Sequence, residues 1–194
     1  MKSKFSYGLL GLLFCTALPG AVEAHTFGAH GAGFADGLVH PFLGIDHLVA
    51  MLAVGFWAAQ LGGAALWRVP LAFLAVMTSG VLWAGTGLDG ALVEAAVAGS
   101  VLALGLMIAL SVRLPSGWGA LLVAVFALFH GHAHGLEMPE AASPWSYGAG
   151  FLLATACLHL AGLALGLSTR RHRVLIRLGG AAIAATGAIL LVGV

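Results

Sequence analysis

A cluster of histidine and aspartate lies in the first long apolar segment of the sequence, where His40, Asp46 and His47 occur close together. On one continuous helix, His40 and His47 would face the same way, about 10 Å apart along the axis. Asp46 would sit about 100° round the helix from His47, as a ligand or as the acceptor that fixes the imidazole tautomer. Pro41 suits a first helical turn, and Gly44 leaves room for an ion to approach the backbone. Imidazole and carboxylate groups in this arrangement could bind a divalent metal ion.

A second histidine cluster lies near the end of a later apolar segment. His130 and His134 are an i,i+4 pair on one helix face, the spacing at which two imidazoles can bind one ion, whereas His132 points away. Glu94 and His159 are expected to be two further buried polar groups in other apolar segments. Because no ring of cysteines accompanies them, these ligands favour nickel, cobalt, zinc or copper(II) over magnesium or a thiolate cluster.

The segments that must position these residues are strongly apolar. Hydrophobic residues make up 61% of the chain and charged residues 8%, against roughly 45–50% and about 25% in a soluble domain. The 29 glycines, with spacings such as Gly162-xxx-Gly166, predict helices that pack closely in lipid. The sequence therefore predicts an all-α polytopic membrane protein. Stretches long enough to cross about 30 Å of hydrocarbon recur at 39–61, 69–88, 91–112, 117–134, 144–167 and 174–192.

The N-terminal segment has the features of a secretory signal peptide. Two lysines precede an apolar core that is too short to span a bilayer, and small residues lead to a predicted cleavage after Ala24. We therefore predict a signal peptide at 1–24 and a six-helix transmembrane domain at 25–194, with His25 as the mature N-terminus. The alternative is an uncleaved first helix.

Charged residues separate along the predicted topology. With the mature N-terminus outside, every arginine falls on the inner side, as the positive-inside rule predicts, and the acidic residues fall on the outer side. The 8 basic residues nearly balance the 7 acidic ones, so no basic surface exists to bind nucleic acid. A mature chain with no lysine and one cysteine, Cys157, also excludes a P-loop and an internal disulfide. The arginines are Arg68, Arg113, Arg170, Arg171, Arg173 and Arg177.

The two histidine segments form extended motifs. The first is His40-Pro41-x-x-Gly44-x-Asp46-His47-Leu48-x-Ala50-Met51, and the second is Phe129-His130-Gly131-x-Ala133-His134-Gly135. They resemble the motifs of the HupE/UreJ family of nickel and cobalt permeases, and the likeness runs over the whole mature chain. The first motif is also similar to the signature of the larger nickel/cobalt transporter family, although five residues rather than four separate His40 from Asp46. The resemblance implies a secondary permease, often associated with hydrogenase or urease maturation. It places the functional side chains on His40, Asp46 and His47, with His130 and His134 next.

We expect a permease rather than an enzyme, in the bacterial inner membrane with a periplasmic N-terminus. Its partners would be the lipid bilayer and a divalent ion, Ni²⁺ or otherwise Co²⁺, carried as substrate with no prosthetic group. His25, with His30 and Asp36, would form an entry vestibule, and His159 would be a deeper relay. The expected metal ligands are His25, His40, Asp46, His47, Glu94, His130, His134 and His159.

Two other classes of protein use the same residue types. A membrane hydrolase could hold a catalytic zinc ion with three protein ligands and an open position for water. A haem-binding electron carrier would need paired axial histidines that face each other across two helices. Net metal flux would separate a permease from the hydrolase, and a visible absorption spectrum would reveal the haem protein.

Overall fold

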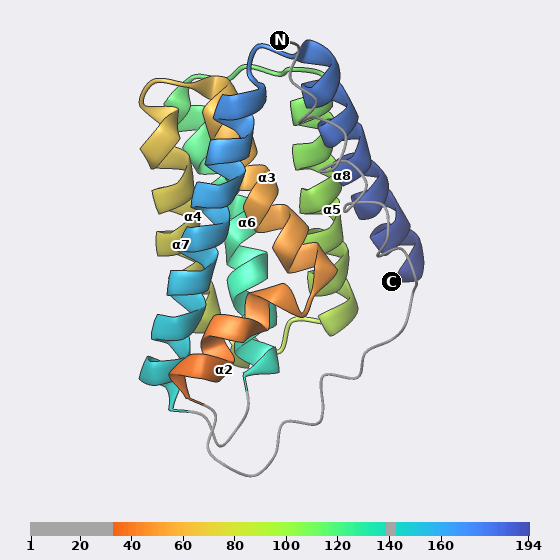
Figure 1. Ribbon diagram of the computed structural model, residues 1–194. Helices are drawn as coiled ribbons and strands as arrows, with labels where there is room; N and C mark the ends of the chain where they lie inside the picture. The colour runs from red at the N-terminus through yellow and green to blue at the C-terminus, as the bar shows by residue number, and fades with distance from the viewer. Residues whose placement is uncertain (1–32, 139–142) are drawn as a thin grey trace.

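The computed structural model describes residues 33–138 and 143–194, and every regular element in these ranges is helical (Figure 1). The predicted all-α class is therefore confirmed for this part of the chain. The predicted signal peptide, His25 and His30 lie outside the described residues. In chain order the elements are α2 (Phe34–Val39), η1 (His40–Phe42), α3 (Ile45–Leu61), α4 (Ala65–Val81), η2 (Ala84–Thr86), α5 (Gly90–Ala109), α6 (Ser116–Glu137), α7 (Pro144–Thr169) and α8 (Arg173–Gly193).

Four helices, α5 to α8, are long and apolar enough to cross a membrane. Their ends lie within a few residues of the bounds predicted from hydropathy. Helix α4 is apolar but shorter, at 17 residues. It starts four residues before the predicted span 69–88 and ends seven residues before the end of that span. The chain leaves α4 after Val81 and makes the η2 turn, which Gly87 ends in a left-handed conformation at φ 74°.

The predicted continuous helix over 39–61 is wrong, because the chain breaks between η1 and α3. The two helical pieces, 34–42 and 45–61, meet at an angle of 83°. Gly44 caps α3 in an extended conformation, at φ −95° and ψ 120°, and Pro41 occupies the first turn of η1. By length and composition, the described residues thus provide four candidate spans, or five if the bent segment is one span.

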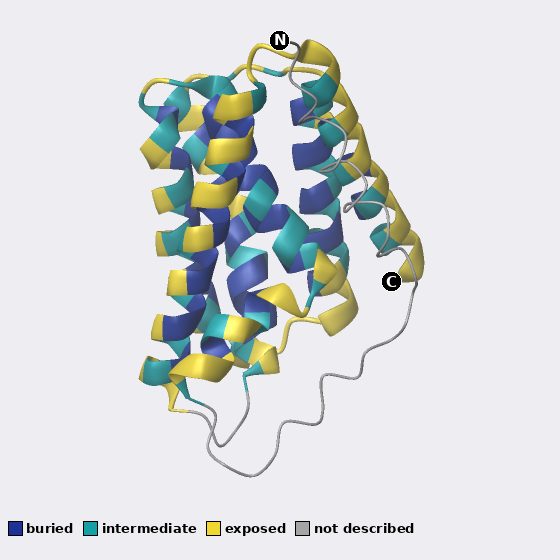
Figure 2. Cartoon of the chain, viewed as in Figure 1, coloured by how far each residue is buried: buried dark blue, intermediate teal, exposed yellow. Residues whose placement is uncertain are grey.

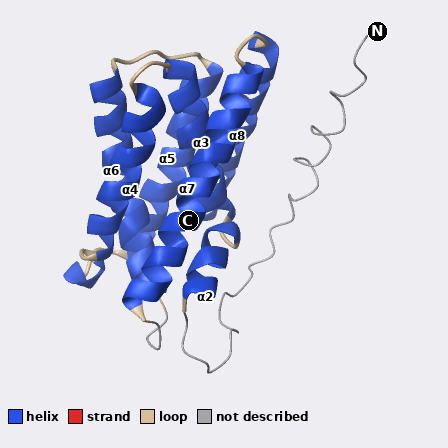
Figure 3. Cartoon of the chain, turned by 60° about the vertical axis from the view of Figure 1, so that its left-hand side comes forward, coloured by secondary structure: helices blue, strands red, loops and turns tan. Residues whose placement is uncertain are grey.

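The helices run side by side and pack mainly in pairs, α4 with α6, α5 with α8, and α3 with α7 (Figures 1 and 3). Helix α2 lies across one end and packs on α7. Gly55 of α3 faces the backbone carbonyl of His159, and Gly162 of α7 faces that of Leu52, so a side chain at either glycine would collide with backbone. Helices α3 and α7 therefore approach as closely as the Gly162-xxx-Gly166 spacing predicts.

Buried residues line the interior of the bundle, whereas much of its outer surface is apolar and exposed (Figure 2). The core includes the fully buried side chains of Trp57, Phe73 and Leu104. Exposed large side chains such as Leu160 and Ile189 suit contact with lipid rather than water. The arginines all lie at or beside the α3–α4, α5–α6 and α7–α8 connections, at the end of the bundle opposite α2 (Figure 1).

Candidate metal centre

The break before α3 places His40 and His47 on different helical pieces, so their predicted common helix face does not exist. His40 begins η1 and His47 lies in the first turn of α3. The 83° bend nevertheless directs both imidazoles toward the last turns of α6. His40 Nε2 lies 3.3 Å from His134 Nδ1, and His47 Nδ1 lies 3.1 Å from His130 Nδ1. The first histidine motif therefore meets the second, although through a different geometry from the one that the sequence predicts.

The inner part of the centre consists of three buried imidazoles, those of His47, His130 and His134. Their side chains are almost completely shielded, with His130 at 0% exposure. One nitrogen from each ring lies within 4.8 Å of the others, close enough for one metal ion to contact all three. His130 and His134 share a face of α6, as the i,i+4 spacing predicts. Three imidazole ligands suit a divalent transition metal.

The outer part of the centre consists of His40, His134 and Glu137, whose ligand atoms also lie within 4.8 Å of one another. Glu137 Oε2 is 3.0 Å from His40 Nε2, 3.4 Å from His134 Nδ1 and 3.9 Å from His47 Nε2. The Glu137 side chain is about half exposed, at 47%, so this part of the centre opens to the surface. His134 belongs to both groups, which makes the two parts of the centre neighbours with one shared ligand.

Sequence reasoning missed Glu137 as a ligand because the predicted span stopped at residue 134. Helix α6 continues to Glu137, three residues beyond His134 and seven beyond His130. These spacings keep the carboxylate on the same helix face as the two imidazoles. The i, i+4, i+7 pattern was therefore the signal that could have identified it.

A second residue missed by sequence reasoning, Ser100 of α5, sets the orientation of His130. The Ser100 hydroxyl donates to the carbonyl of Val97 at 2.7 Å, and its oxygen lies 2.9 Å from His130 Nε2. Because the single hydroxyl proton is used on Val97, a neutral His130 donates Nε2–H to Ser100 and leaves Nδ1 without a proton. That bare Nδ1 faces His47 and is the atom available to a metal ion.

Asp46 contacts His47 rather than completing either ligand group. Its Oδ1 accepts a hydrogen bond from the His47 backbone N–H at 2.8 Å, and its Oδ2 lies 3.8 Å from His47 Nε2. The carboxylate is thus placed to orient the His47 side chain and add negative charge beside it, which is one of the two roles that the sequence allowed.

The remaining predicted ligands lie apart from the two groups in the described residues. His159 is buried on α7, where Nδ1 donates to the carbonyl of Met51 at 2.8 Å and Nε2 has no partner. Glu94 is exposed on α5, and the structure does not bring it into either group. His132 belongs to neither group, as predicted, but it is buried with both ring nitrogens unpaired.

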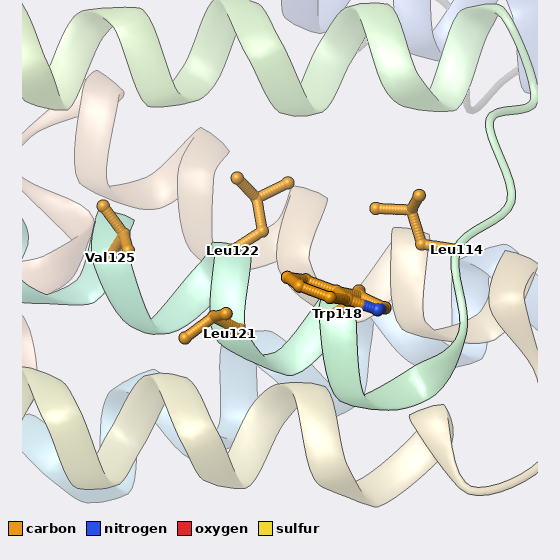
Figure 4. A pocket seen from close by; sticks show the side chains of 5 residues that line it. All are labelled: Leu114, Trp118, Leu121, Leu122 and Val125. Atoms are coloured by element: carbon orange, nitrogen blue, oxygen red, sulfur yellow. The ribbon is translucent and has the colours of Figure 1, made fainter.

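A separate pocket beside α6 has a volume of about 360 Å³. Figure 4 shows its lining, which is formed by Leu114, Trp118, Leu121, Leu122 and Val125. None of these side chains offers an oxygen, sulfur or imidazole ligand, so this pocket cannot hold a transition metal. The candidate metal centre is therefore the histidine–carboxylate centre at the other end of α6.

The long apolar helices and the apolar outer surface define a multi-pass helical membrane protein. The chain belongs to the HupE/UreJ family, because the family described as HupE / UreJ protein matches residues 13–190. It is also 46% identical over 185 residues to Protein HupE of Rhizobium leguminosarum bv. viciae, across 93% of this chain and 95% of that protein. The family resemblance predicted from the histidine motifs is thus confirmed. No solved structure matches the chain.

Proposed function

We propose that the protein is a secondary permease that takes up a divalent transition metal ion, Ni²⁺ or otherwise Co²⁺, across the bacterial inner membrane. The observation that carries this proposal is the buried group of three imidazoles that shares His134 with a surface-open group containing Glu137. Such ionisable side chains are costly within a membrane protein and usually mark an ion or substrate path. Family membership supports the same conclusion.

The outer group contains a carboxylate and the inner group does not. In our proposal, an ion binds first to the outer group and then passes to the inner group. Glu137 supplies a carboxylate at the open mouth, where it attracts a hydrated dication. The inner group consists of imidazoles alone, with the Asp46 carboxylate 3.8 Å from His47 Nε2, so no carboxylate belongs to the inner group of ligands. Conduction needs sites that bind well enough to admit an ion and weakly enough to release it. Transfer from the outer to the inner group keeps His134 as a ligand, so the ion never loses all its protein contacts.

His159 extends this path toward the middle of the bundle in our proposal. Its Nδ1–H is used on the Met51 carbonyl, so the buried Nε2 carries an unshared lone pair. Its ring packs perpendicular to that of Phe73, with ring centroids 5.1 Å apart, and the Phe73 centroid also lies 5.5 Å from that of His130. The His159 ring is thus the next imidazole that an ion would meet below the three-imidazole group.

The topology is part of the proposal. Six spans require α4 to cross the bilayer as well. Its 17 residues are at the lower limit of length for a transmembrane helix, so the bilayer would have to be thin at this point. A periplasmic mature N-terminus at His25, after signal removal, would then put the metal centre on the periplasmic side and the arginines in the cytoplasm. His25 and His30 would capture ions near the mouth of the centre.

No ATP-binding motif is needed for such uptake. A dication that moves inward through about −100 mV gains about 4.6 kcal/mol, enough for roughly thousandfold accumulation. The imported ion would serve metalloenzyme maturation, as the hydrogenase or urease link of the family suggests. The three buried imidazoles would suffice as zinc ligands, but the family to which the chain belongs favours transport over the zinc hydrolase. The His47 and His130 nitrogens, at 3.1 Å, are too close to admit a haem between them.

Radioactive nickel and cobalt uptake by cells with and without the protein tests this function. We expect faster, saturable uptake of one or both ions with the protein, and its loss when His47 is replaced by alanine. Equal uptake with and without the protein, at confirmed expression in the membrane, would contradict the proposal.

A further inference from the structure

A second polar cavity, with a volume of about 770 Å³, lies at the end of the bundle opposite the metal centre. Its walls come from α3, the α5–α6 connection, the end of α7, the α7–α8 connection and the first turns of α8. Helix α8 packs chiefly on α5 and only slightly on α7, which leaves the space between them. Five of the six arginines of the protein line this cavity, namely Arg113, Arg170, Arg171, Arg173 and Arg177.

The arginines of the cavity have no acidic neighbours to neutralise them. No aspartate or glutamate lines the cavity, and every ion pair in the described part of the chain involves a histidine instead. Guanidinium groups bind phosphate oxygens in a bidentate fashion, so several of them around one space form a site for a phosphate-bearing anion. The same charge would repel a free dication.

The positive-inside rule accounts for basic residues at this end but not for their arrangement around a cavity. Arg68 provides the comparison, because it lies at the same end and outside the cavity. Its guanidinium donates to the Ser116 hydroxyl at 3.1 Å and lies over the Trp67 ring at 5.2 Å. Arg68 thus has neighbouring groups as partners, whereas the five arginines that line the cavity are exposed and take part in none of the ion pairs of the described residues.

Apolar side chains also line the cavity and help to specify the ligand. Phe56, Ala59 and Ile176 form this apolar part, which suits the hydrocarbon next to a lipid headgroup. Gln60, another lining residue, donates to the carbonyl of Ile108 at 3.2 Å.

We propose that this cavity binds the headgroup of an anionic phospholipid such as phosphatidylglycerol from the surrounding leaflet. The arginines would hold the phosphate, and the apolar part of the lining would contact the start of the acyl chains. Basic pockets between transmembrane helices on the cytoplasmic side bind anionic headgroups in this way. The site is independent of metal transport, so the two proposals can fail separately.

Lipid binding to the purified full-length protein tests the proposal. Delipidated protein is mixed with phosphatidylglycerol or phosphatidylcholine in detergent micelles, and binding is measured by native mass spectrometry and by the shift in unfolding temperature. The variant Arg113→Gln/Arg173→Gln/Arg177→Gln is compared with Arg68→Gln, which removes a charge at the same end but outside the cavity.

We expect the wild type and Arg68→Gln to prefer phosphatidylglycerol, and the triple variant to bind it roughly 100-fold more weakly, since each basic residue contributes about a factor of five. If the triple variant does not fold, Arg177→Gln alone should weaken binding about fivefold. Equal binding of both lipids, or no effect of the cavity variants, would overturn the proposal. Inorganic phosphate that displaces the lipid and stabilises the protein alone would also overturn it, in favour of a free-anion site.

Discussion

Replacing His134 by alanine should damage both halves of the metal centre at once. His134 is the ligand shared by the buried group with His47 and His130 and by the outer group with His40 and Glu137. Its loss would leave two imidazoles in the inner group and one imidazole with one carboxylate in the outer group. No other residue of the centre belongs to both groups, so His134→Ala should be the most severe single histidine substitution.

The expected size of the effect follows from the ligand count. Loss of a residue that only orients a ligand commonly costs roughly 10–100-fold in metal affinity. Removal of a shared ligand should lower the metal affinity by at least the upper end of this range, roughly 100-fold. This loss corresponds to about 2.7 kcal/mol, at about 1.36 kcal/mol per factor of ten. At low external nickel, uptake by cells carrying His134→Ala should therefore fall nearly to the level of cells without the protein.

His132→Ala is the matched control, because His132 is also buried on α6 but belongs to neither group. Both of its ring nitrogens lack partners, so alanine relieves that cost while leaving a small cavity. The gain from removing the unpaired nitrogens and the loss from the new cavity oppose each other, so the net change in stability should be small. Because no metal ligand is removed, nickel uptake should change less than about threefold. Initial rates of radioactive nickel uptake, divided by the amount of protein in the membrane, compare the two variants. Equal loss in both would refute the shared-ligand reasoning.

Three further predictions follow from the described contacts. Glu137→Gln should raise the half-saturating nickel concentration roughly 10–100-fold while high nickel restores the rate, and an unchanged concentration would exclude the carboxylate from the path. In a cysteine-free background, Thr169→Cys should react only with membrane-permeant thiol reagents and Thr86→Cys with impermeant ones, whereas the reverse labelling would invert the topology. Gly105→Ala should destabilise the protein by about 1–3 kcal/mol, because a methyl group there meets the α8 backbone, whereas Gly99→Ala faces open space and should leave the unfolding temperature nearly unchanged.

Hydropathy predicted the helices well because apolar runs of membrane-spanning length leave few alternatives. The bend before α3 could not be predicted from hydropathy. Pro41 and Gly44 are compatible with the first turns of a continuous helix, as well as with a break. The direction of the bend depends on α2, where Gly37 packs against the backbone of Tyr147 far along the chain. A contact of this range cannot be inferred from local sequence.

The candidate site was predictable where local spacing determines geometry. The shared face of His130 and His134 followed from the helical repeat, whereas the contact of His47 with His130 depends on how α3 packs beside α6. Glu94 shows the limit of such reasoning. Helix α5 is apolar on all sides, so its sequence carries no amphipathic signal for which face turns inward. The structure leaves Glu94 exposed and instead directs Ser100 of the same helix to His130.

Nickel flux into liposomes that contain only the purified protein tests the central claim most directly. With an imposed inside-negative potential, the wild-type protein should accumulate radioactive nickel to a level set by that potential, and His130→Ala should not. His132→Ala should accumulate nickel as the wild type does. Absence of flux with correctly folded wild-type protein, or equal flux through wild type and His130→Ala, would contradict an ion path through the buried imidazoles.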